Sequence, residues 1–184
     1  MIRSALCLLA LLTLPTTLVL AQETSLYMDS ESGDYIGQGL EWYYTPDTAD
    51  FSASQIGNSS LNGVQCWINT LEPSWGWWNL NFTAPAGMEL TVGEYSGATR
   101  YPFNDPDEPG LSISGMGRGC NTLTGNFYVH EITFGPDNTV ETFWATFEQH
   151  CEGGDPALFG EIRFNAGVVA TLNVNWGDLK GMFR

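Results

Sequence analysis

The sequence predicts an all-β fold, built as a single antiparallel β-sandwich or jelly-roll-like barrel. Apolar and polar residues alternate with a period of two in run after run of the chain. Short turn-forming segments separate these runs, in a chain with 21 glycines and 9 prolines. No segment after residue 21 sustains the 3.6-residue apolar repeat of an amphipathic helix.

Residues 1–21 have the pattern of a secretory signal peptide. An arginine near the start precedes an apolar run, and Val19 and Ala21 precede the expected cleavage point. The run is short for a membrane span, and no later run is long enough for one. We therefore expect a secreted protein, periplasmic or extracellular, with residues 22–184 forming a single β domain.

The alternating runs predict strands at residues 40–45, 77–82, 110–115, 126–134, 139–149, 159–165 and 168–176. GPDN at 135–138 is typical of a hairpin connection between two of them. The apolar run GVQCWI around Cys66 is also strand-like. The last run predicts an added edge strand.

Period-two alternation assigns the side chains of each strand to two faces. The residues expected to point into the core are Trp78, Leu80, Phe82, Val140, Phe143, Ala145, Phe147, Ile162 and Phe164, with a bulge near Val140. The outward residues mix aromatic and polar side chains: Trp75, Trp77, Asn79, Asn81, Trp144, Thr146, Glu148, Glu161, Arg163 and Asn165. If these strands share a sheet, its outer face carries Trp, Asn, Glu and Arg together.

Such a face has the chemistry of a sugar-binding site. Aromatic rings stack on the apolar faces of pyranoses, while amides, carboxylates and guanidinium groups bind the hydroxyls. The candidate ligand-binding residues are Trp75, Trp77, Asn79, Trp144 and Arg163. The alternative is that these tryptophans only cover the sheet, because Trp is mostly buried in folded proteins.

The chain is strongly acidic, with 21 Asp plus Glu against 6 Lys plus Arg and a formal net charge of −15. Such a charge repels phosphate groups, so nucleic acid is not an expected partner. An extracellular glycan or protein remains compatible with it, and so does calcium. In the acidic loop at 25–39, the candidate calcium ligands are Asp29, Glu31 and Asp34. The alternative is a solvated turn, with no cofactor.

The cysteines predict one disulfide. Cys120 and Cys151 lie in Gly-rich, turn-like segments, whereas Cys66 lies in an apolar run. In an oxidising compartment we expect the first two to be bonded and Cys66 to be buried and unpaired. The bond closes a loop of about 30 residues, which contributes about 3 kcal/mol on the chain-entropy model.

The neighbours His150, Cys151 and Glu152 do not favour a Cys–His hydrolase or a zinc site. Adjacent strand residues point to opposite faces, and the chain has 2 histidines in no metal-binding spacing. An alternative ligand site is a cluster at one end of the sandwich, formed by Asp34, Arg118, His150 and Glu152.

Arg100 and Arg118 each stand beside a turn. In a chain with so few cations, we expect both to bind loop carbonyls and to pair with acids, Asp34 or Glu152 being reasonable partners.

A glycoside hydrolase uses two carboxylates, and Glu148 with Glu161 are the outward pair that could serve. Arg163 stands two residues from Glu161 and favours a salt bridge for that group instead. No Ser-His-Asp pattern is present.

The blocks GRGCNTLTG (117–125) and FEQHCEGGDPALFGEIR (147–163), with SGDYIGQG (32–39) and GATRYPF (97–103), resemble an uncharacterised family of secreted bacterial β-domains. The resemblance implies an exported, bacterial setting and agrees with the pairing of Cys120 with Cys151. The chain departs from that pattern in Cys66 and after Asn165.

The sequence thus favours a secreted, non-catalytic module that binds carbohydrate or another extracellular ligand. Two alternatives remain: a structural or surface-associated protein without a small ligand, and a glycoside hydrolase.

Overall fold

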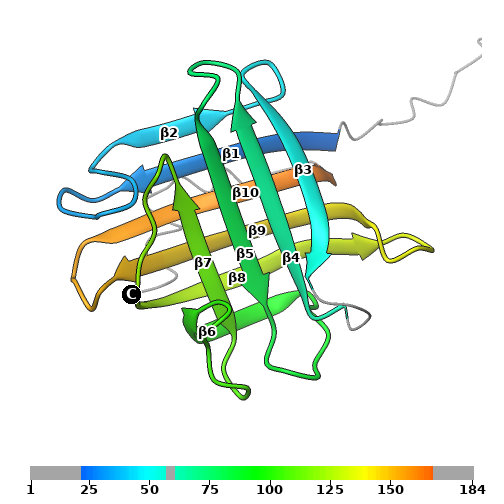
Figure 1. Cartoon of the computed structure of the whole chain (residues 1–184). Helices are drawn as coiled ribbons and strands as arrows, with labels where there is room; N and C mark the ends of the chain where they lie inside the picture. The colour runs from blue at the N-terminus through cyan, green and yellow to red at the C-terminus, as the bar shows by residue number, and fades with distance from the viewer. Residues whose placement is uncertain (1–21, 57–60, 168–184) are drawn as a thin grey trace, which may run out of the picture.

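The computed structural model describes residues 22–56 and 61–167, and this part of the chain is all-β, as predicted (Figure 1). Its strands are β1 (Gln22–Ser30), β2 (Glu41–Tyr44), β3 (Ala49–Ile56), β4 (Gly63–Thr70), β5 (Trp77–Thr83), β6 (Gly93–Arg100), β7 (Gly110–Gly115), β8 (Leu123–Phe134), β9 (Val140–Cys151) and β10 (Ala157–Gly167). The predicted signal peptide and the predicted edge strand at 168–176 lie outside the described residues.

All ten strands of this part join one sheet, in the order β2-β1-β10-β9-β8-β6-β7-β5-β4-β3. Its pairs are antiparallel except for a short parallel contact, where Thr99 pairs with Gly110 and Arg100 with Leu111. The sheet curls on itself, so that β7, β5, β4 and β3 cross over β1, β10, β9 and β8 (Figure 1). It approaches a barrel, with β2 and β3 as its edges.

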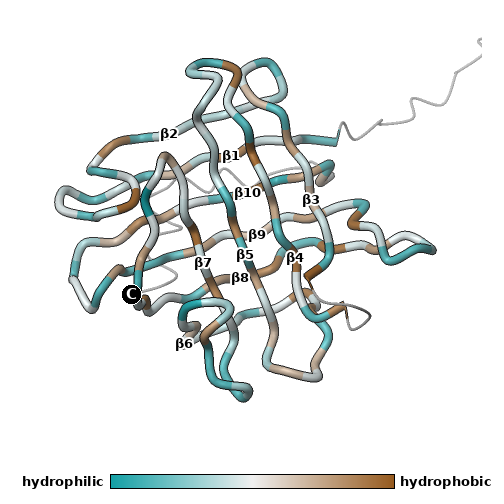
Figure 2. The backbone as a smooth tube through the Cα atoms, in the orientation of Figure 1, coloured by the Kyte–Doolittle hydropathy of each residue, from teal (hydrophilic) through white to brown (hydrophobic). Residues whose placement is uncertain are grey.

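The core fills the space between these two halves of the sheet. Phe82 of β5 is fully buried, with its ring centroid 5.4 Å from that of Phe127, 5.3 Å from Phe143 and 6.0 Å from Phe147. Hydrophobic and hydrophilic residues alternate along the strands of both halves (Figure 2). The predicted inward residues are confirmed: all are buried except Phe164, which is partly buried and packs against the core.

The predicted hairpin at residues 135–138 and the predicted bulge near Val140 are also present. At the β8–β9 hairpin, the Gly135 N–H donates to Thr139 and the Asn138 N–H to Gly135, and Asn138 has a left-handed φ of 58°. The bulge near Val140 is confirmed, because Thr133 pairs with Thr142 while Phe134 pairs with Val140.

Three strands were not predicted, namely β1, β3 and β6. The prediction of a loop starting at residue 25 is wrong for its first part. Leu26 and Met28 are fully buried, so that alternation continues through Asp29 in β1. The sequence does not reveal β6, because this strand carries few apolar residues and contains a register shift at Gly97, where φ is 70°.

The predicted disulfide between Cys120 and Cys151 is confirmed. It joins the end of β9 to the segment between β7 and β8. Cys66 is free and buried, as expected, and burial raises the pKa of its thiol.

Candidate functional site

The curl of the sheet separates the predicted ligand-binding residues into two groups. Trp78 of β5 and Phe147 of β9 both point into the core, so their outward neighbours point to opposite sides of the molecule. Trp77 and Asn79 therefore lie on one outer face, and Trp144 and Arg163 lie on the other. The structure does not bring the five residues together.

The first outer face, which we call the tryptophan face, consists of the outward side chains of β4, β5 and β7: Gln65, Trp67, Asn69, Trp77, Asn79, Asn81, Ser112 and Ser114. Strand register aligns them in rows. Trp67 pairs with Asn79 and Asn79 with Ser114, while Gln65 pairs with Asn81 and Asn81 with Ser112. Aromatic rings, amides and hydroxyls thus alternate across three neighbouring strands.

Two indole rings of this face lie together and reach solvent. Trp67 is 39% exposed, Trp77 is partly exposed, and their ring centroids are 5.8 Å apart at an interplanar angle of 46°. Trp75 lies in the loop between β4 and β5 and is 69% exposed. Rings that cover a core are more deeply enclosed, as Trp78 is at 0%. The rings are tilted to each other, so a ligand with an apolar surface can stack on one ring and contact the other at an angle.

The amides beside the indoles form a short hydrogen-bonded chain. The Asn81 Nδ2 donates to Asn79 Oδ1 at 2.6 Å, and the Gln65 Nε2 donates to Asn81 Oδ1 at 2.9 Å. The Asn79 Nδ2 is buried and has no hydrogen-bond partner. A buried donor without an acceptor is costly, but this donor would reach a ligand oxygen only after the Asn79 side chain rotates.

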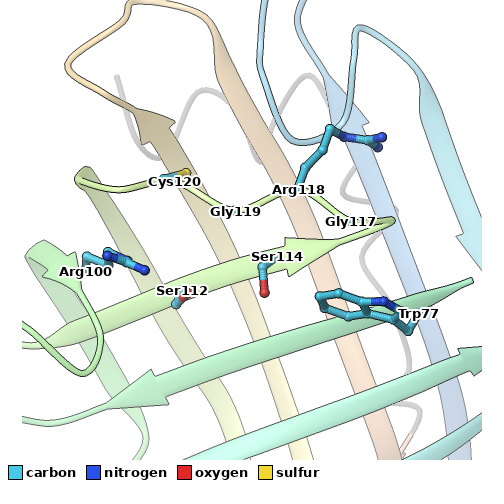
Figure 3. A pocket seen from close by; sticks show the side chains of 8 residues that line it. All are labelled: Trp77, Arg100, Ser112, Ser114, Gly117, Arg118, Gly119 and Cys120. Atoms are coloured by element: carbon cyan, nitrogen blue, oxygen red, sulfur yellow. The ribbon is translucent and has the colours of Figure 1, made fainter.

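A pocket of about 350 Å³ opens at the edge of the tryptophan face (Figure 3). Its lining residues are Trp77, Arg100, Ser112, Ser114, Gly117, Arg118, Gly119 and Cys120. The wall after β7 is a tight turn in which the Arg118 N–H donates to Gly115, and the disulfide of Cys120 ties it to β9. Sequence and register thus place an indole, two hydroxyls and a guanidinium group around one cavity.

The two arginines of the pocket bind loop carbonyls, as expected. Arg118 donates from Nε to the Ile36 carbonyl at 2.8 Å, and Arg100 donates from Nη1 to the Asn121 carbonyl at 3.0 Å. The expected pairing with acids is wrong in the described residues, where no carboxylate lies within 4.0 Å of either guanidinium group. Glu152 instead accepts hydrogen bonds from the Asn121 and Thr122 backbone, which lowers its pKa.

The polar groups around Trp144 on the second outer face pair with one another. The Arg163 guanidinium lies 4.4 Å from the Trp144 ring centroid and pairs with Glu161 at 2.7 Å and with Glu23 at 2.8 Å. The Trp144 Nε1 donates to Glu161 at 2.6 Å. The salt bridge expected for Glu161 is therefore present. Glu148, the second carboxylate of the hydrolase hypothesis, is buried, and its Oε1 lies 2.9 Å from His150 Nε2.

His130 on this second face makes a pH-dependent contribution to stability. Burial, with help from the Arg163 charge, lowers its pKa from 6.5 to about 4, and its ring stacks on Trp144 at 4.5 Å. As the pH is lowered, the His130 imidazole is protonated in the unfolded chain before it is protonated in the folded protein. The free energy of unfolding is therefore expected to fall as the pH decreases from 6.5 to 4. Urea unfolding of His130→Asn should show a smaller fall across this window, and an unchanged slope would contradict the assignment.

The alternative cluster does not form. Asp34 accepts hydrogen bonds from Ser30 Oγ at 2.8 Å and from the Gly37 N–H at 2.6 Å, inside its own turn. Arg118 reaches the same loop through Ile36, but His150 and Glu152 have the separate contacts given above.

The three candidate calcium ligands are not gathered either. Asp29 lies in β1, Asp34 is held in its turn, and Glu31 accepts a hydrogen bond from the Ala157 N–H at 3.1 Å. Across residues 22–56 and 61–167, no group of three or more His, Cys, Asp or Glu side chains could hold a metal ion.

Several residues of the site were not predicted as ligand-binding, among them Trp67, Arg100, Ser112 and Ser114. A signal existed for three of them. Cys66 and Ile68 point into the core, so Trp67 between them points outward. The alternation of GLSISG places both serines on one face. Arg100 stands at the end of β6, which the sequence did not reveal.

No family model, no curated protein and no solved structure matches the chain. The resemblance of its Cys120 and Cys151 blocks to secreted bacterial β-domains therefore stays a prediction. In the described part of the chain there is no helix of the length and hydrophobicity needed to cross a membrane.

Proposed function

We propose that this protein is a secreted, non-catalytic module that binds carbohydrate on its tryptophan face. The observation that supports this most is the exposed Trp67–Trp77 pair, whose ring centroids are 5.8 Å apart, beside rows of amide and hydroxyl side chains. A pyranose offers apolar C–H faces to indole rings and equatorial hydroxyls to neighbouring amides and serines. The tryptophan face supplies both kinds of group within one register row.

The second outer face is a weaker candidate for the same function. There the Trp144 ring is covered by Arg163 on one side and stacks on His130, and its Nε1 is bonded to Glu161. These contacts occupy the surfaces that a sugar would use. They also engage Glu161, which leaves the hydrolase alternative without a free carboxylate pair.

The disulfide supports the secreted setting, because such bonds persist in oxidising compartments. A structural protein without a small ligand remains the alternative function. The two functions can be distinguished by measurement, because a structural protein of this kind would bind no saccharide on its tryptophan face.

Replacement of both Trp67 and Trp77 by alanine is expected to abolish binding on a glycan array. Each lost ring should weaken binding about tenfold or more, because aromatic anchors dominate binding energy at such sites. Tyr43→Ala is the matched control, because this ring is 61% exposed on β2 and lies outside the tryptophan face. Thermal melting should confirm that all variants fold.

The proposal is contradicted by two results. One is a wild-type protein that binds no saccharide on the array. The other is binding that survives in the Trp67→Ala, Trp77→Ala double variant but disappears in Trp144→Ala.

A further inference from the structure

The pocket at the edge of the tryptophan face has an unusual charge for this chain. The described residues include only three Lys or Arg side chains, and two of them, Arg100 and Arg118, line this pocket. No Asp or Glu lines it, although the chain has 21 of them. A second pocket of about 330 Å³, beside β2, is lined by both Asp47 and Glu72. The first pocket is thus a positive site on an acidic protein.

Arg100 is the group that can bind a ligand there. Its side chain extends toward Ser112 across the pocket (Figure 3). One nitrogen donates to the Asn121 carbonyl, and the group lies 4.8 Å from the Phe103 ring centroid. These contacts hold the guanidinium in place but leave its charge unneutralised and most of its five N–H donors available.

Arg118 has a different role. Its side chain points away from Ser112 and Ser114 (Figure 3), and it binds the carbonyls of Ile36 and Met116. The bond to Ile36 fastens the wall of the pocket to the loop after β1. The following residues, Gly119 and Cys120, also line the pocket, and their N–H groups donate to no described residue.

We propose that the saccharide bound on the tryptophan face carries a carboxylate, which Arg100 binds in this pocket. This inference rests on the function proposed above. A guanidinium group binds a planar carboxylate through two parallel hydrogen bonds, and the hydroxyls of Ser112 and Ser114 line the same pocket. A single available guanidinium suits one negative charge. Polyanions such as heavily sulfated glycans are disfavoured, because the net charge of −15 repels them.

The test is an array of uronate- and sialate-bearing oligosaccharides, each printed beside its methyl ester, which keeps the shape and removes the charge. Wild-type protein is expected to bind at least one free acid about tenfold more tightly than its ester. In Arg100→Gln this preference should disappear, because binding of the free acid falls to the level of its ester. Arg100→Lys should retain part of the preference, because lysine keeps the positive charge but cannot form the two parallel hydrogen bonds of a guanidinium group.

The outcomes separate the two proposals. Equal binding of acids and esters by the wild type overturns the carboxylate inference and leaves carbohydrate binding intact. A preference for acids that persists in Arg100→Gln overturns the assignment to this pocket. Binding of no saccharide overturns both proposals. The comparison of acid with ester uses wild-type protein, so it holds even if a variant does not fold.

Discussion

The Phe82→Ala substitution is expected to lower the free energy of unfolding by about 3–5 kcal/mol. Phe82 is fully buried, and its ring contacts Phe127, Phe143 and Phe147 on the opposite half of the sheet. Its removal leaves a cavity where the two halves meet and breaks three aromatic contacts at once. Urea unfolding followed by fluorescence measures the change.

Tyr43→Ala is the control for this prediction, since its ring is 61% exposed. The loss there should stay near or below about 1 kcal/mol. A Phe82→Ala protein no less stable than Tyr43→Ala would contradict the position of Phe82 between the two halves.

Removal of the disulfide, by the paired substitutions Cys120→Ala and Cys151→Ala, is expected to cost about 3–4 kcal/mol of stability. The bond spans a sequence separation of 31 residues, and opening that loop increases the entropy of the unfolded chain. Urea unfolding measures this loss, and a reducing agent should lower the stability of the wild type by a similar amount. It should have little effect on the double variant.

The pocket provides a second measurement on the same variant. Cys120 forms part of the wall beside Arg118, so the loss of the bond should also weaken saccharide binding. Cys66→Ala is the control, because that thiol is free and buried on the inner side of β4. A double variant that is as stable as the wild type, with or without reductant, contradicts this account.

Local pattern was enough to predict most of the fold. Alternation identified the strands that carry Trp78, Phe143 and Ile162 into the core, because burial on one face imposes a period of two. It failed for β3, for β6, where Gly97 and a register shift interrupt the pattern, and for β1, where Asp29 and Glu31 suggested a loop. Turn chemistry identified the hairpin at Asn138 and the disulfide at Cys151.

The site could be predicted only in part, because it depends on how the sheet curls. The sequence predicts one surface for the outward residues of β5 and β9 if the two strands share a sheet, and the strands do share one. Alternation defines inside and outside for each strand but not which outer surfaces coincide. Trp77 and Trp144 consequently lie on opposite sides, and Trp77 lies beside Trp67 and lines the pocket that Ser114 and Arg100 also line.

The binding of a saccharide to the tryptophan face is the central claim, and NMR of the indole N–H signals tests it most directly. The signals are assigned from single Trp→Phe variants, and the protein is titrated with the saccharides that it retains on the array. We expect the signals of Trp67 and Trp77 to shift with ligand while those of Trp78 and Trp144 stay in place. Shifts of Trp144 alone, or no shift of Trp67 and Trp77 with any saccharide, would contradict the claim.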